Sequence, residues 1–170
     1  MPWRGFPKYL AAAGLVWILG ILLGLAILNP PSMNFPQKDT PQYPWAWGIF
    51  SNNLRVLAGC FLGLITGSAA SLATLVLNGI YTGFLWNALT HRASGWKVIG
   101  FLVPHGLLEV PGLLLAGAAG MMGGAIARSI FMDDPVELRR YAEILVYIIP
   151  LSVILIFIAA FIESWSISRI

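Results

Sequence analysis

"YLAAAGLVWILGILLGLAIL", residues 9–28, decides the class of fold, because it carries no charged side chain over its whole length. An apolar helix of about 20 residues is long enough to cross the hydrocarbon core of a bilayer. Arg4 and Lys8 precede the run as they would in a signal peptide. However, the run is too long for a signal core, and no small-x-small cleavage site follows it. We therefore interpret it as a retained first membrane span.

The composition extends this interpretation to the rest of the chain. Of the 170 residues, 58% are hydrophobic and 10% are charged, and the mean hydropathy is +0.81. Soluble domains carry about 25% charged residues. The short alternating segments of a transmembrane barrel are absent from the sequence. We predict an all-α fold, a polytopic transmembrane helical bundle of about five membrane segments that forms a single integral membrane domain over residues 1–170.

Charge and cysteine content narrow the classes of partner. The net charge of +3 comes without a basic patch interleaved with aromatic residues, so we expect no nucleic-acid partner. Cys60 is the single cysteine, which excludes a disulfide framework and a thiolate metal cluster. The sequence has no phosphate loop, dinucleotide fingerprint or HExxH motif. We therefore expect no cofactor and no enzymatic activity, and the lipid bilayer is the partner that the composition implies.

The apolar runs suggest where the other spans lie. The run from Asn53 to Leu89 is too long for one span and must break, either at Asn78-Gly79 or near residues 68–71. A proline-rich stretch, residues 29–49, reads as an extramembrane loop. The predicted spans are approximately 9–28, 53–70, 72–90, 104–127 and 142–164. Four spans with a half-inserted segment are the alternative.

Positive charge suggests the orientation in the cell membrane. Arg4 and Lys8 lie before the first span, and cytoplasmic flanks are enriched in lysine and arginine. We therefore expect a multi-pass protein with a cytoplasmic N-terminus. Five spans place Arg128, Arg139 and Arg140 inside, whereas four spans place them outside, so the side of the C-terminus stays open.

"FLVPHGLLEVPGLLLAGAAG", residues 101–120, is apolar but contains two prolines and two ionisable residues. The residue before a proline avoids the α region, so Val103-Pro104 predicts a break between two helices. Pro104 is then suited to the first turn of the second helix. Pro111 removes a further helical hydrogen bond, and Gly106 permits a local bend. We predict a proline- and glycine-broken helix at Pro104.

The ionisable residues form a candidate polar cluster. His105 and Glu109 are four residues apart and share a helix face, and Glu163 is a second carboxylate near the membrane. Ionisable residues inside membranes are normally tolerated against a partner or a water-filled cavity. The cluster is either a hydrogen-bonded structural group or an ion or proton site, and a bound metal stays open. Three amides extend the candidate cluster: Asn52, Asn53 and Asn78.

Small residues recur every four positions in two segments. This spacing lets helix backbones approach closely, which is how helices associate in lipid. The predicted packing positions are Gly59, Gly63 and Gly67 in one segment and Gly112, Ala116, Gly120 and Gly124 in the other. We expect packing within the chain to be the main use, with a subunit interface as the alternative. Gly112, Ala116 and Gly120 continue the face that carries His105 and Glu109.

Several of these motifs together resemble the stage II sporulation protein M family of integral membrane proteins. They are "NN" at the start of a helix, "GxxxGxxxG", "NG", "PHGLLEVPGLLLAGAAG" and a terminal "AAFIES", which together cover about residues 52–166. The resemblance implies about five spans and a scaffold role, as in a founding member that organises cell-wall hydrolases at a sporulation septum. The short proline-rich loop leaves little room here for docking a large hydrolase.

Two functions are consistent with these features. The first is a non-enzymatic membrane scaffold or assembly protein, expected to form a homodimer and to bind another membrane or envelope protein. The second is a small transporter or channel in which His105, Glu109 and Glu163 handle an ion or proton. An intramembrane metal-dependent hydrolase ranks last, because it needs at least three convergent ligands and an activated water.

Overall fold

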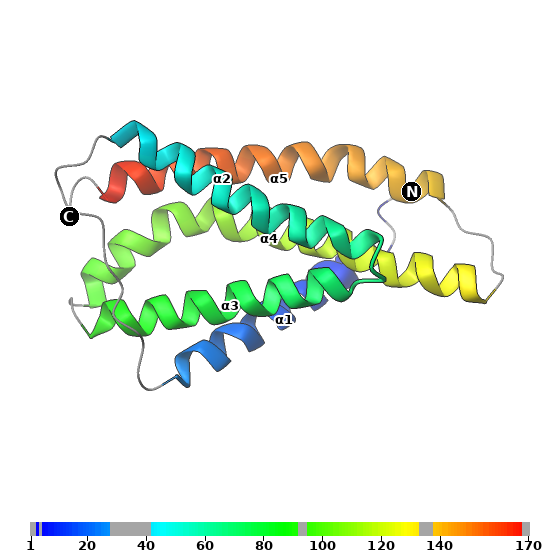
Figure 1. Ribbon diagram of the computed structural model, residues 1–170, viewed down its shortest axis with the longest axis horizontal. Helices are drawn as coiled ribbons and strands as arrows, with labels where there is room; N and C mark the ends of the chain where they lie inside the picture. The colour runs from blue at the N-terminus through cyan, green and yellow to red at the C-terminus, as the bar shows by residue number, and fades with distance from the viewer. Residues whose placement is uncertain (1–2, 4, 28–41, 92–94, 133–137, 168–170) are drawn as a thin grey trace.

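The computed structural model describes residues 3, 5–27, 42–91, 95–132 and 138–167. These residues form five α-helices and one short 3-10 helix. The elements are α1 (Phe6–Leu25), α2 (Gln42–Phe61), η1 (Leu62–Leu64), α3 (Ala69–Thr90), α4 (Gly95–Phe131) and α5 (Leu138–Ile167). Each helix runs in the opposite direction to the helix before it, and the starts of α1 and α5 lie at the same end of the bundle (Figure 1).

Four helical segments are long and apolar enough to cross a membrane: Phe6–Leu25, Ala69–Thr90, Gly106–Phe131 and Leu138–Trp165. The prediction of an all-helical bundle with membrane-type helices is confirmed, and the described residues contain no β-strand. Five segments were predicted, and α2 is the helix that is not among these four. Gln42, Asn52, Asn53 and Arg55 make it less apolar than the other helices.

The chain reverses direction between α2 and α3 in a turn of residues 65–68. Gly67 and Ser68 adopt left-handed backbone conformations there, with φ of 59° and 80°. The reversal is at the second of the two candidate positions, because Asn78-Gly79 lies inside α3. The prediction that Gly67 lies on a helix is wrong. Gly67 lies in the turn, where a left-handed backbone favours glycine because it has no Cβ atom.

α2 begins earlier than expected. It starts at Gln42, so the C-terminal part of the predicted loop 29–49 is helical, and residues 29–41 lie outside the described part of the chain. Pro44 falls in the first turn of this helix. A proline costs little there, because the first N–H groups of a helix have no partner within the helix. The proline-rich composition therefore extends into the start of a helix.

The predicted helix break at Pro104 is wrong. α4 is helical from Gly95 to Phe131 and contains both Pro104 and Pro111. Its ribbon changes direction within its first half (Figure 1). A bend is the usual way in which a helix accommodates a proline that lacks an N–H donor and crowds the preceding turn. Gly106 makes no close contact, since a Cβ atom there would meet nothing within 4 Å.

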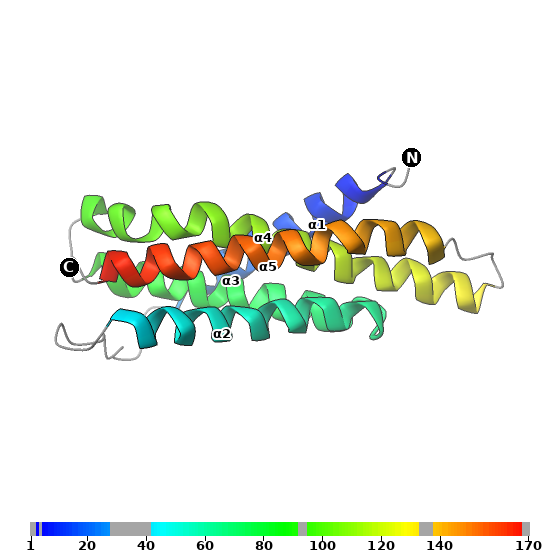
Figure 2. The same cartoon turned by 90° about the horizontal axis from the view of Figure 1, so that it is seen from above.

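α4 is the central helix of the bundle. It contacts α1, α2, α3 and α5, and Figure 2 shows α5 running along it. Its middle turns are built from small residues, and Ala116, Ala118 and Ala119 are fully buried. A helix that is apolar on all sides is suited to such a position. The close packing around α4 determines where the polar side chains of the neighbouring helices meet.

Candidate functional site

A small polar cavity lies where α2, α3, α4 and α5 meet. Asn53 of α2, Asn78 of α3 and Glu109 of α4 contribute its polar lining. Its apolar lining is Val56, Leu57, Leu113 and Ile156. The cavity has a volume of about 10 Å³, which is about the minimum space for one water molecule. The site is therefore a packed polar contact between helices, with no room for a larger ligand.

Asn78 links this cavity to α1. The indole Nε1 of Trp17 donates a hydrogen bond of 2.9 Å to Asn78 Oδ1. The backbone carbonyl of Asn78 accepts a second bond, of 2.9 Å, from the hydroxyl of Thr82. On the other side of the cavity, Asn53 is 8% exposed, and its Nδ2 has no hydrogen-bond partner among the described residues. A buried donor without a partner is costly, so a water molecule in the cavity would stabilise Asn53.

Two carboxyl groups, one on α4 and one on α5, belong to this region of the bundle. Glu109 of α4 and Glu163 of α5 are near enough to interact electrostatically, and Tyr81 of α3 interacts with both. A phenol hydroxyl can donate a hydrogen bond to a carboxylate. The sequence reasoning missed Tyr81. Its spacing from Asn78 is the signal that could have found it, since residues three apart share a helix face.

The structure places the predicted polar residues unequally. Four of them lie in the same region of the bundle: Asn53, Asn78, Glu109 and Glu163. Asn52 does not, because its side chain is exposed, about 100° around α2 from that of buried Asn53. The side chain of His105 lies outside the described side chains, so its expected pairing with Glu109 stays a prediction. The described residues contain no group of three or more His, Cys, Asp or Glu side chains that could hold a metal ion.

The predicted small residues of α4 lie at close helix contacts. A Cβ atom at Gly120 would overlap the carbonyl oxygen of Cys60, and one at Gly124 would lie 2.8 Å from Ser68 Oγ. A Cβ atom at Gly112 would lie 3.2 Å from its nearest neighbours, which belong to α5. Ala116 is fully buried.

The small residues of α2 and η1 lie equally close to their neighbours. A Cβ atom at Gly63 would lie 2.9 Å from the carbonyl oxygen of Gly120, and one at Gly59 would lie 2.7 Å from Thr74 Oγ1. Small side chains at these positions let α2, α3, α4 and α5 pack closely.

A second pair of glycine motifs joins α1 to α3 and was missed. Cβ atoms at Gly20 and Gly24 would collide with the backbone of α3, and Cβ atoms at Gly79 and Gly83 would collide with the backbone of α1. The two motifs therefore pack reciprocally, as small-xxx-small helix pairs do. The GxxxG spacing was visible in both segments. However, the sequence suggested only a turn for Gly79, which is used here for a close helix crossing.

Comparison with known proteins covers nearly the whole chain. The sequence profile described as Stage II sporulation protein M matches residues 13–166. An uncharacterized protein of Methanocaldococcus jannaschii is 29% identical over 162 residues, an alignment that covers 89% of this chain and 89% of that protein. No solved structure matches the chain. Since the profile extends from the first helix to the last, the chain belongs to the stage II sporulation protein M family.

Proposed function

We propose that the protein is a non-enzymatic membrane scaffold that binds a helix of another membrane or envelope protein along one face of α2. Membership of the family and the four apolar helices support a multi-pass membrane protein. The observation that carries the proposal is the polarity of the α2 face that no other part of the described chain covers.

The depth of α2 in the bundle supports treating it as a fifth membrane crossing. Asn53 and Val56 line the same cavity as Asn78, which lies near the middle of α3. α3 is one of the helices suited to cross a membrane. Arg55 lies between Asn53 and Val56 in the sequence, so it too sits at about mid-depth. α2 also contacts α3, α4 and α5, as a member of the bundle.

The exposed face of α2 is poorly suited to lipid. Four exposed residues lie within about 100° of one another around the helix: Gly48, Ser51, Asn52 and Arg55. No ion pair involves Arg55 among the described residues. An arginine at the centre of a spanning helix costs about 2.5–3.5 kcal/mol on insertion scales and is normally paired. A partner helix with a carboxylate at that depth would offset this cost, and Gly48 and Ser51 would let its backbone approach closely.

A different protein fits this face better than a second copy of the chain. α2 carries no aspartate or glutamate, so the α2 helix of a second copy has no carboxylate to pair with Arg55. A two-fold interface presents the same patch from both subunits, which would bring two arginine-bearing faces together. The homodimer expected from the sequence would therefore use another face, such as the exposed apolar side of α1 or α5.

The basic residues support a cytoplasmic N-terminus. Lys8, Arg139 and Arg140 lie near the starts of α1 and α5, which share one end of the bundle (Figure 1). Arg128 belongs to the last turn of α4 at the same end. The positive-inside rule assigns an end enriched in lysine and arginine to the cytoplasm. This orientation, with five crossings, places the end of α5 on the outer side.

Ion or proton transport is the second candidate function, and the electrostatic interaction between Glu109 and Glu163 favours it. Two adjacent carboxyl groups can share a proton, and carboxylates of this kind occur in membrane proton relays. The cavity that Glu109 lines has room for about one water molecule. In the scaffold proposal a proton shared by these groups would join α4 to α5.

Site-specific photo-crosslinking in cells separates these functions. A p-benzoylphenylalanine at position 51 lies on the polar face of α2, and one at position 77 lies on an exposed apolar face of α3. We expect a protein adduct at position 51 that Arg55→Leu reduces at least tenfold, because loss of one member of a buried charge pair is costly. Adducts only with lipid at both positions would contradict the scaffold. Proton flux in liposomes that Glu109→Gln abolishes would instead establish transport.

A further inference from the structure

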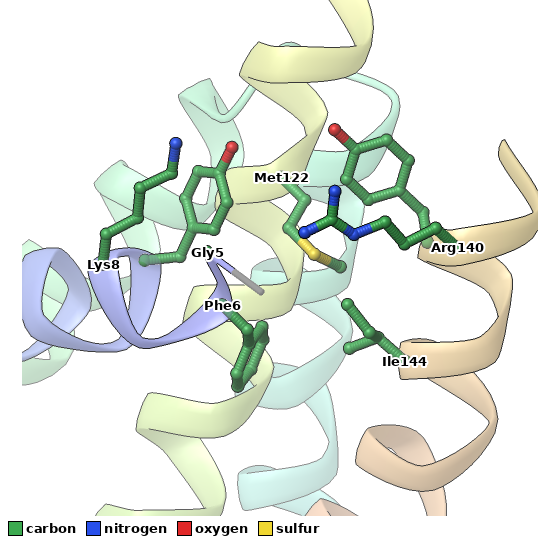
Figure 3. Close-up of a pocket in the computed structure, with 8 residues that line it drawn as sticks. Gly5, Phe6, Lys8, Met122, Arg140 and Ile144 are labelled. Carbon is green, nitrogen blue, oxygen red and sulfur yellow. The ribbon is translucent and has the colours of Figure 1, made fainter. Parts of the chain in front are cut away.

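A second cavity, of about 130 Å³, lies at the end of the bundle where α1 and α5 begin. It is more than ten times the size of the cavity beside Glu109, and it has room for a group much larger than water. Lys8 of α1 and Arg140 of α5 approach it from opposite sides, with Met122 of α4 between them (Figure 3). Three helices that are distant in the sequence therefore build this pocket together.

The rim of the pocket is suited to an anion. Two tyrosines, Tyr9 and Tyr141, add hydroxyl groups to the ammonium of Lys8 and the guanidinium of Arg140. No described lining residue is acidic. Glu143, a nearby carboxylate of α5, pairs with Arg139 at 3.1 Å on the exposed side of the helix. Arginine, lysine and tyrosine together offer several donors to a phosphate oxygen.

The beginning of α1 adds to the positive character of this rim. Gly5 precedes the helix with a left-handed φ of 94° and also lines the pocket. The first turn of α1 carries no acidic residue and has no side-chain cap. Pro7 has no N–H, and the Phe6 N–H donates to the Trp3 carbonyl at 3.0 Å. The aligned peptide dipoles still give the start of the helix a partial positive charge that favours an anion. The basic side chains and the helix terminus therefore attract the same ligand.

The floor of the pocket is apolar and distinguishes a lipid from a free ion. Phe6, Met122 and Ile144 are all at least 94% buried, and Phe6 and Ile144 lie on the side of the pocket away from the Lys8 ammonium in Figure 3. A basic rim above an apolar floor matches a phospholipid at the level where its headgroup joins its acyl chains. Basic pockets between membrane helices bind anionic headgroups in this way.

We propose that this pocket binds the phosphate group of an anionic phospholipid from the leaflet that faces the start of α1. Lys8 and Arg140 contact the phosphate oxygens, the two tyrosines donate hydrogen bonds, and Phe6 and Ile144 contact the first carbons of the lipid. This site is separate from the α2 face and from the Glu109–Glu163 interaction, so it does not depend on the scaffold proposal.

The test measures lipid retention by the full chain. The protein is reconstituted in phosphatidylcholine nanodiscs with and without phosphatidylglycerol, and bound phosphatidylglycerol is counted by native mass spectrometry. We expect Lys8→Gln and Arg140→Gln each to weaken retention about fivefold, since one basic group near a membrane surface contributes about that factor. Lys8 is exposed, so its replacement leaves the fold intact. Arg128→Gln removes an exposed charge at the same end outside the pocket and is the matched control.

The outcomes separate a lipid from a free anion. Retention that falls in the Lys8 and Arg140 variants and persists in the Arg128 variant supports the proposal. Equal retention by all four proteins overturns it, because the pocket residues would then contribute nothing. An equal loss in all three variants also overturns it, because any basic residue would then serve. Inorganic phosphate that displaces phosphatidylglycerol, or that raises the melting temperature as much in its absence, overturns the lipid assignment in favour of a free-phosphate site. No retention by the wild-type protein also overturns it.

Discussion

Trp17 and Asn78 join α1 to α3 through a hydrogen bond of 2.9 Å from the indole Nε1 to the amide Oδ1. The contact lies beside the crossing in which Gly20 and Gly24 meet Gly79 and Gly83. The amide also lines the cavity that holds Asn53 and Glu109. One side chain therefore connects the helix-packing motif of the first helix with the polar cluster of the other four.

Removal of the indole donor should destabilise the bundle. Trp17→Phe keeps an aromatic ring but leaves Asn78 Oδ1 without its donor, so we expect the free energy of unfolding to fall by about 1 kcal/mol. Asn78→Ala and the double variant complete a cycle, measured by denaturant titration in micelles. We expect the effects to be non-additive, because both single changes remove the same bond. Additive losses would mean that the bond contributes nothing to stability.

A methyl group at the α1–α3 crossing should separate these helices. Gly24→Ala places a Cβ atom against the carbonyl of Ile80, and we expect a loss of about 1–3 kcal/mol from overpacking. Gly14→Ala lies on the same helix, where a Cβ atom would meet nothing within 4 Å. This control should be neutral or stabilising by up to about 1 kcal/mol, because alanine favours helix. Thermal unfolding of both variants in one detergent checks the difference, and equal losses would contradict the close crossing.

The two carboxyl groups should make stability depend on pH. When both Glu109 and Glu163 are ionised they repel each other, and Glu163→Gln removes this repulsion while keeping the shape of the side chain. We therefore expect the variant to gain stability relative to the wild type as the pH rises. Melting temperatures of both proteins across a pH series measure this.

Glu143→Gln is the matched control for that series. Glu143 lies on the same helix as Glu163, but it is exposed and pairs with Arg139. Its replacement should cost no more than about 0.5 kcal/mol, because exposed ion pairs of this spacing contribute little. A Glu163 variant whose melting temperature follows the wild type at every pH would show that the two carboxyl groups do not interact.

The hydroxyl of Ser68 should stabilise the turn between α2 and α3. Ser68 Oγ donates to the carbonyl of Met121 at 2.7 Å and accepts from the N–H of Gly124 at 2.9 Å. Ser68→Ala loses both bonds and keeps the left-handed φ of 80°, so we expect a loss of about 1–2 kcal/mol. Thr90→Val, which removes exposed bonds within a single helix, should cost much less. Similar losses in the two variants would indicate that the turn does not depend on α4.

The length of the apolar runs was sufficient to predict a helical membrane bundle, because only a helix satisfies its own backbone groups in lipid. The predicted break at Pro104 failed because a bend within α4 accommodates the proline, and local sequence does not reveal how neighbouring helices support such a bend. Local sequence also could not show that Gly79 faces α1.

In the polar cluster, four residues were predictable as polar residues in apolar runs: Glu109, Glu163, Asn53 and Asn78. Tyr81 was missed, because tyrosine is common in such segments and only its spacing from Asn78 marks it.

The turn of residues 65–68 has a consequence for the biogenesis of the protein. α2 contains Asn52, Asn53 and Arg55, and by composition it is not among the helices suited to enter a bilayer alone. α3 follows it after only the residues of this turn and is suited to do so. We expect the translocation machinery to insert α2 and α3 together as one hairpin. The favourable free energy of transferring α3 into the bilayer would then offset the unfavourable free energy of inserting α2. With a longer linker at this turn, we expect α2 to remain at the membrane surface during synthesis.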